Sequence, residues 1–111
     1  MITGVKTDDR AWCEEIFGPV VCLRPFTDET KMLQEVNDTS FGLSGSIWSR
    51  DLSQALRVAR RVESGVISIN THSSVHTEAP FGGFKRSGLG RDLGMSAMEA
   101  CTEVKNIYVG E

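Results

Sequence analysis

The sequence predicts an α/β fold with parallel strands, in the order strand, helix, strand, helix, strand. Short apolar runs at 19–23 and 65–69 are rich in β-branched residues, and 43–48 is a third candidate strand. Helical patterns at 27–36 and 51–63 lie between these runs, with connections of a few residues. Strands that alternate with helices in this way usually pair in parallel through right-handed crossovers. We therefore predict a parallel βαβαβ arrangement.

The first helix should follow the first strand almost at once. Residues 1–15 have no clean periodicity and predict an irregular beginning. Thr27 is the expected N-cap, because Asp28 and Glu29 then place carboxylates in the first turn, where the helix dipole favours them. Apolar residues follow at helical spacing, at Met32, Leu33 and Val36.

The second helix, at 51–63, has the clearest pattern in the chain, and Ser64 and Gly65 end it. Its apolar residues form one stripe, made of Leu52, Ala55, Leu56, Ala59 and Val62.

A long loop is expected at 70–94, which holds two histidines, one proline and five glycines without a regular apolar period. Loops of this length within compact domains are more often functional than idle. A short helix near 95–101 and a final strand or extended tail near 104–109 should follow.

Composition excludes several classes of protein. The 111 residues carry a formal net charge of -3, which argues against a nucleic-acid partner. No apolar run approaches the ~20 residues that span a bilayer, so no membrane association is expected. Cys13, Cys22 and Cys101 are an odd number without a Cys-x-x-Cys pair. They favour buried or half-buried thiols in a reducing cytoplasm over a disulfide framework.

The glycine-rich stretch at 80–94 does not fit the known phosphate loops. Its G-x-G-x-x-x-G spacing is one residue too long for the dinucleotide fingerprint, and the Walker pattern is missing. The glycines instead suggest positive φ angles and close backbone approach. Three cations in this stretch could meet an anion or simply be solvated, namely Lys85, Arg86 and Arg91.

The same loop carries residue types that occur in metal and hydrolase sites. His72, His76 and Glu78 would suit zinc only on a helix, which the surrounding serines, threonine and proline disfavour, so no metal is expected. A serine hydrolase lacks its G-x-S-x-G elbow, and nothing places a cysteine beside a histidine.

Two carboxylates at Glu14 and Glu15 precede Phe17 and a Gly-Pro turn that leads into the first strand. A carboxylate can accept two hydrogen bonds at once, which suits a vicinal diol such as a ribose. A solvated acidic turn is the simpler interpretation of these residues alone.

Several motifs together resemble the aldehyde dehydrogenase superfamily. Residues 14–20 resemble its E-E-x-F-G-P element, and residues 80–91 resemble its P-F-G-G-x-K-x-S-G-x-G-R element. Segments 41–48, 65–70 and 102–106 also match family segments in the expected order. The resemblance runs from about residue 3 to residue 109. It implies that the chain is a C-terminal fragment of the catalytic domain, at 1–101, followed by an oligomerisation strand at 102–111.

The resemblance also implies a reaction, in which a cysteine thiolate attacks an aldehyde and the thiohemiacetal gives a hydride to NAD or NADP. Glu15 would hold the nicotinamide ribose, and Phe17 would pack beside the nicotinamide. Phe81 would line the aldehyde tunnel near Asn70 and the variable loop at 71–78. The parent enzyme would be a cytoplasmic homo-oligomer.

Two departures from the family qualify that expectation. Asp92 stands where many members carry a glutamate. The nucleophile's motif matches none of the three cysteines, so we expect no catalytic residue in this chain and no turnover by the chain alone. Two alternatives remain, a truncated interaction or assembly module and an unrelated small α/β binding protein.

Overall fold

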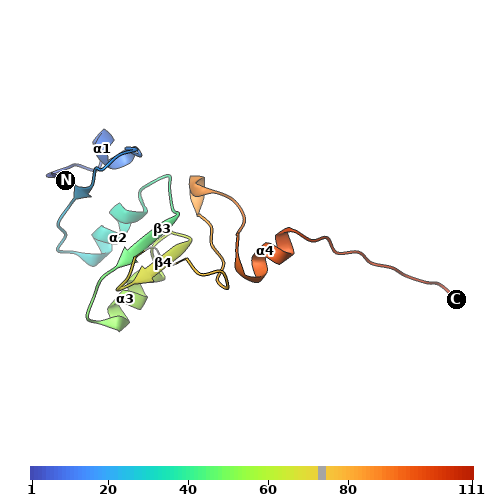
Figure 1. Ribbon diagram of the computed structural model, residues 1–111. Coiled ribbons are helices and arrows are strands. Elements are labelled where there is room, and N and C mark those ends of the chain that lie inside the picture. Colours follow the sequence, from blue (N-terminus) through green and yellow to red (C-terminus); the bar gives the residue numbers. More distant parts are fainter. Residues whose placement is uncertain (73–74) are drawn as a thin grey trace. The chain divides into compact units, whose positions relative to one another are not determined.

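A parallel βαβ unit organises the second part of the chain. Strand β3 (Ser44–Ile47) pairs in parallel with β4 (Val66–Ile69), and α3 (Leu52–Ala59) connects them (Figure 1). The computed structural model describes residues 1–72 and 75–111 and divides the chain into two units, 1–39 and 40–111. The predicted α/β class with parallel strands and connecting helices is confirmed in both units.

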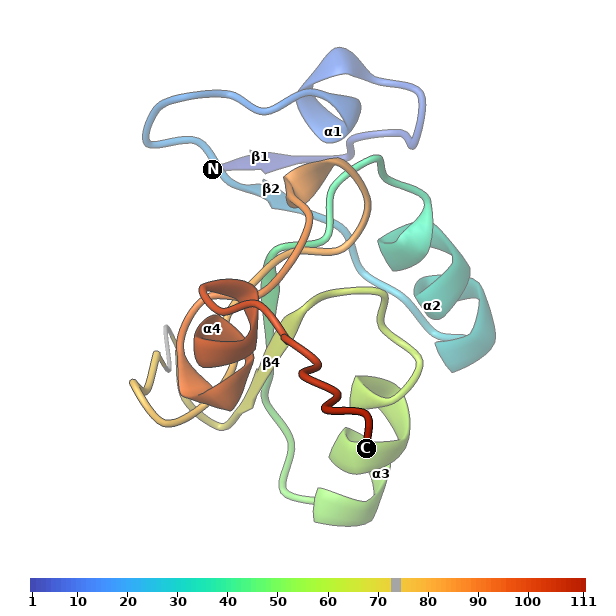
Figure 2. The ribbon, with the colours of Figure 1, turned by 90° about the vertical axis from the view of Figure 1, so that its right-hand side faces the viewer.

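The first unit contains a second parallel pair. Strand β1 (Ile2–Thr3) pairs with β2 (Cys22–Leu23), and α1 (Arg10–Cys13) lies between them in sequence (Figure 2). The prediction of an irregular beginning was therefore wrong for β1 and α1, which are too short to show a periodicity in the sequence. The three predicted strands do not form one sheet. Strand β2 pairs with β1, and β3 pairs with β4, which gives two separate two-stranded sheets.

Helix α2 (Glu29–Asn37) completes the first unit. Its N-cap is Asp28, whose carboxylate accepts from the Lys31 N–H at 2.9 Å, so the predicted cap at Thr27 was one residue early. The Asp28 backbone is extended, as a cap requires, and its carboxylate carries a full charge to the helix dipole. Arg24 fastens the helix, because its guanidinium binds both carboxylate oxygens of Glu35 at 3.0 and 3.1 Å.

Helix α3 is shorter than the pattern predicted. Asp51 caps it by accepting from the Gln54 N–H at 3.1 Å. Ala55 and Val58 are its buried residues, whereas Leu52 and Leu56 of the predicted stripe are exposed.

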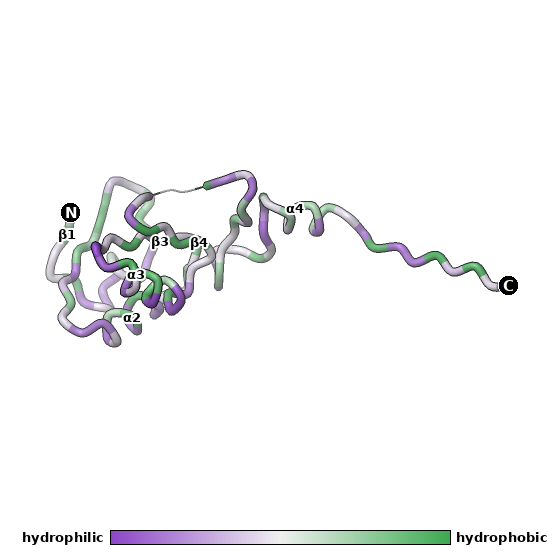
Figure 3. The backbone as a smooth tube through the Cα atoms, turned by 90° about the horizontal axis from the view of Figure 1, so that it is seen from below, coloured by the Kyte–Doolittle hydropathy of each residue, from purple (hydrophilic) through white to green (hydrophobic). Residues whose placement is uncertain are grey.

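The chain ends in helix α4 (Gly94–Ala100) and an extended tail (Figure 1). Apolar residues alternate irregularly with polar ones along the tail (Figure 3), and Val104, Ile107 and Val109 are almost fully exposed. The structure assigns no strand to 102–111. A strand needs a partner strand, so the strand at 104–109 and the boundary at residue 101 remain predictions. Within the described parts of the chain, no helix is long and apolar enough to cross a membrane.

Candidate functional site

The glycine-rich loop packs directly on the βαβ unit through two other glycines. The Gly42 carbonyl accepts from the N–H groups of Gly65 at 3.0 Å and Phe84 at 2.8 Å. A Cβ atom on Gly65 would overlap the carbonyl oxygen of Gly82, and one on Gly42 would overlap that of Glu63. The predicted close backbone approach therefore occurs, and it requires glycine at positions 42 and 65.

Side chains of the loop reinforce this packing. The Ser87 hydroxyl accepts from the Gly42 N–H at 2.9 Å, and the Lys85 ammonium pairs with Glu63 at 2.7 Å. Arg91 donates to the Gly83 carbonyl at 3.0 Å, and its guanidinium lies 5.4 Å from the centre of the Phe84 ring. Lys85 and Arg91 thus hold the loop in place. The sequence had suggested only anion binding or simple solvation for these two cations.

Phe81 lies near the start of the glycine-rich loop, where it pairs with a later residue of the same loop. It forms an isolated antiparallel bridge with Asp92, with both N–H···O distances at 2.7 Å. The Phe81 side chain lines a pocket of about 270 Å³ together with His72 and Val75 of the variable loop. Residues 73–74 of that loop lie outside the described residues. The structure therefore brings Phe81 and part of the loop at 71–78 together, and the contact of Phe81 with substrate stays a prediction.

Asn70, the other predicted substrate residue, does not line this pocket. It follows β4 in the left-handed region, with φ at 56°, which asparagine tolerates better than most residues. Its side-chain amide accepts from the Ser49 N–H at 2.9 Å and donates to the Ser49 carbonyl at 3.0 Å. These bonds join the ends of β3 and β4, so Asn70 is a positioning residue in this chain, and its contact with substrate stays a prediction.

The pocket also has a polar wall that the sequence interpretation missed. Ser44, Ser46 and Ser68 line it from β3 and β4. The Ser46 hydroxyl lies 3.1 Å from Nδ1 of His72. The sequence could have indicated this wall, because Ser44 and Ser46 are two residues apart and their side chains therefore lie on one face of a strand.

The second histidine of the loop has a different partner. Nδ1 of His76 lies 4.0 Å from the Glu78 carboxylate, and both side chains are largely exposed. A backbone hydrogen bond within Glu78, helped by the Thr77 hydroxyl at 3.2 Å, lowers the pKa of the Glu78 carboxyl. Over the parts of the chain that the structure describes, no three potential ligands are grouped as a metal site would need.

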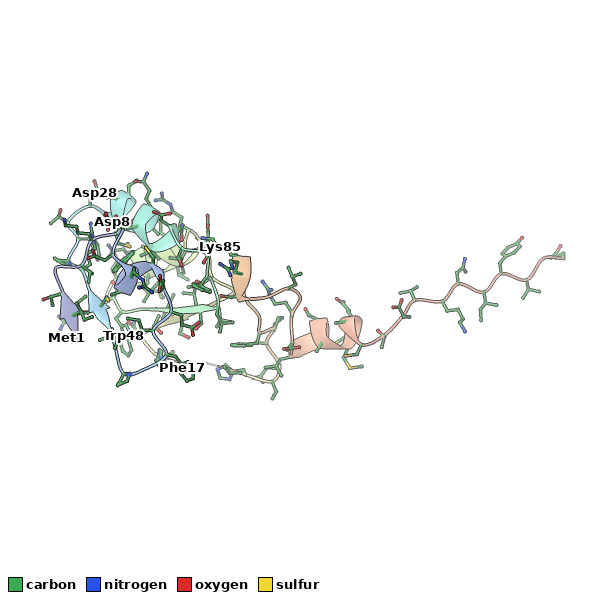
Figure 4. All side chains as sticks on the ribbon, turned by 90° about the horizontal axis from the view of Figure 1, so that it is seen from above. Met1, Asp8, Phe17, Asp28, Trp48 and Lys85 are labelled. Atoms are coloured by element: carbon green, nitrogen blue, oxygen red, sulfur yellow. The ribbon has the colours of Figure 1, made fainter. Side chains whose placement is uncertain are left out.

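Glu15 and Phe17 belong to the first unit, on the loop that joins α1 to β2. Both are exposed, and the Phe17 ring is fully exposed (Figure 4). The neighbouring Glu14 is engaged locally, because Arg10 donates to its two carboxylate oxygens at 2.9 Å each, which also raises the pKa of the Arg10 guanidinium. Glu15, the other carboxylate of the pair, takes no part in this bidentate contact and lies two residues before Phe17 in the sequence.

All three cysteines are free. Cys22 is half-buried as predicted, but Cys13 and Cys101 are exposed, so the predicted burial was wrong for these two. The Cys13 thiol donates to the Thr7 carbonyl at 3.0 Å, and the Cys22 thiol donates to the Ala11 carbonyl at 3.3 Å. A carbonyl acceptor suits a protonated thiol, whereas a nucleophile must be a thiolate.

Relatives of known activity match nearly the whole chain. Betaine aldehyde dehydrogenase 1 of Rhizobium meliloti is 47% identical over 97 residues, which are 87% of this chain and 20% of that protein. Phenylacetaldehyde dehydrogenase of Pseudomonas fluorescens is 42% identical over 104 residues, which are 94% of this chain and 21% of that protein. The chain spans about a fifth of the length of these relatives.

Solved structures agree with the fold. An aldehyde dehydrogenase from Bacillus cereus in complex with NAD+ superposes with a TM-score of 0.91 at 38% identity, over 96% of this chain and 22% of that one. An indole-3-acetaldehyde dehydrogenase variant of P. syringae in complex with NAD+ gives a TM-score of 0.87 at 40% identity, over 93% and 21% of the two chains. Residues 1–107 match the aldehyde dehydrogenase family as a whole. With its parallel βαβ unit and its glycine-rich loop in the same arrangement as these enzymes, the chain belongs to the aldehyde dehydrogenase family.

Proposed function

We propose that this chain works as the C-terminal segment of an enzyme that oxidises an aldehyde to a carboxylic acid with NAD or NADP. The observation that carries the proposal is the pocket beside Phe81, which the variable loop helps to line through His72 and Val75. The glycine-rich loop holds Phe81 at this place through its bridge to Asp92. Phe81 then forms an apolar wall for the aldehyde, and Asn70 fixes the turn from which the variable loop departs.

Glu15 and Phe17 form the proposed cofactor contact. Both side chains are exposed and two positions apart in the sequence. A carboxylate can accept from both ribose hydroxyls of a nicotinamide riboside, and an aromatic ring offers a flat apolar surface to its base. When bound, the nicotinamide accepts a hydride from the substrate. The role of Glu15 is to orient the ribose, and the role of Phe17 is to shield one side of the reacting ring from water.

The attacking thiolate and the general base come, in this proposal, from outside these residues. The thiols of Cys13 and Cys22 donate to backbone carbonyls, which is the setting of a neutral structural thiol. The chain would then supply walls and cofactor contacts, and the remainder of the enzyme would supply the reacting groups and most of the nucleotide site.

The tail is proposed to complete the assembly. Its exposed apolar residues would become buried if 102–111 joined the sheet of another subunit as an added strand. This gives the homo-oligomer expected for the parent enzyme, with 1–101 as the catalytic part. The three free thiols support a reducing compartment, and we place the enzyme in the cytoplasm.

The exposed tail also favours one alternative, a non-catalytic module that binds other dehydrogenase subunits. Co-assembly would distinguish it. The isolated chain, mixed with a full-length relative, should enter the oligomer without changing the rate per active site if this alternative holds.

Turnover is the test of the main proposal. The full-length product of the gene that encodes this segment should reduce NAD+ or NADP+ when an aldehyde is added, and the isolated 111 residues should not. Reduction of the cofactor by the isolated chain would contradict the assignment of the nucleophile. Failure of the full-length product with a broad panel of aldehydes would contradict the function itself.

A further inference from the structure

The pocket beside Phe81 has one polar wall, built by alternate residues of the two paired strands. The parallel register sets Ser46 of β3 opposite Ser68 of β4, and Ser44 lies two residues before Ser46 on the same face. All three serines line the pocket, together with Val66, which the register sets opposite Ser44 on the same face. Their hydroxyl groups therefore gather on one surface, and each can donate as well as accept a hydrogen bond.

His72 extends this polar wall. The 3.1 Å contact between the Ser46 hydroxyl and Nδ1 fixes the imidazole against β3, while the ring lines the same pocket. An imidazole has a second nitrogen, Nε2, which donates or accepts according to the tautomer. Phe81, Val75 and Val66 supply the apolar part of the lining.

We propose that this pocket receives an aldehyde whose carbon chain carries a hydroxyl group, with Ser46 and His72 as specificity-determining residues. The inference rests on the proposed function and names its substrate class. The substrate's carbon chain packs on Phe81 and Val75, and its hydroxyl group replaces the water that would otherwise bind the polar wall. An apolar aldehyde of equal size displaces that water without replacing its hydrogen bonds, and so it binds less well.

Two aldehydes of equal size test the inference. The full-length gene product should oxidise 3-hydroxypropanal with a kcat/KM about tenfold or more above that for butanal, which has a methyl group in place of the hydroxyl. Ser46→Ala should reduce this ratio severalfold, mainly through a higher KM for the hydroxyaldehyde. Ser53→Ala is the matched control, because Ser53 is exposed on α3 away from the pocket, and it should leave the ratio unchanged.

His72→Phe provides a second variant in case Ser46→Ala folds poorly, and it should also bring the ratio toward one. Equal oxidation of the two aldehydes by the unaltered enzyme would overturn the inference and leave the proposed function intact. So would a preference that survives both pocket substitutions. If the enzyme oxidises no aldehyde at all, the proposed function fails and the inference fails with it.

Discussion

Gly65→Ala is expected to lower the free energy of unfolding by about 3 kcal/mol or more, and to remove most of the aldehyde oxidation of the full-length enzyme. The added Cβ would overlap the carbonyl oxygen of Gly82 and come within 2.8 Å of its carbonyl carbon. Backbone atoms cannot rotate away as a side chain can, so the glycine-rich loop must move off β4. Phe81 precedes Gly82 directly, and the pocket that it lines would be distorted with it.

Denaturant unfolding of the purified protein measures this effect. Gly18→Ala is the control, because a Cβ at Gly18 meets nothing within 4 Å, and its stability should change by no more than about 0.5 kcal/mol. If Gly65→Ala and Gly18→Ala unfold at the same denaturant concentration, the close packing of the loop on β4 does not exist in solution.

Placing charges in the tail should dissociate the oligomer of the full-length enzyme. Ile107 and Val109 are 79% and 84% exposed here, and in an added strand they would share one face. A double substitution, Ile107→Asp with Val109→Asp, would bury two unpaired carboxylates at the proposed subunit contact. Such a burial costs several kcal/mol in total, enough to shift the assembly toward single subunits by a factor of 100 or more, by order of magnitude.

Light scattering after size-exclusion chromatography gives the mass of the assembly directly. Asn106→Ser serves as the control, since it changes a polar residue on the opposite face of the same proposed strand and should leave the assembly intact. An unchanged oligomer after the double substitution would mean that the tail lies outside the subunit contact.

Local patterns predicted the βαβ unit well. The candidate strand at 43–48 and the apolar run at 65–69 correspond to β3 and β4, and the amphipathic pattern after Asp51 corresponds to α3. The apolar run at 19–23 contains only the two residues of β2. The cap of α2 was displaced by one residue, because Thr27 and Asp28 are both good caps and only the backbone geometry decides between them. Strand β1 has two residues, too few for any pattern to reveal.

Contacts between distant residues were harder to predict. The glycines of the loop indicated a close approach between backbone segments. Their spacing alone could not show that the loop packs against Gly42 and Gly65. The Ser46–His72 contact joins residues 26 positions apart, through a turn that Asn70 allows by adopting a positive φ. Phe81 and the variable loop were placed together only by their resemblance to a family, and the pocket agrees with that placement.

The mass of the protein that carries this segment in its source cells tests the central claim most directly. An antibody raised against the segment should detect a polypeptide about five times the 12.2 kDa of this chain, because the chain corresponds to 20–22% of its relatives. Such a species would identify the chain as a working part of a larger dehydrogenase. A single species at 12.2 kDa would contradict that account and point to a free-standing assembly module.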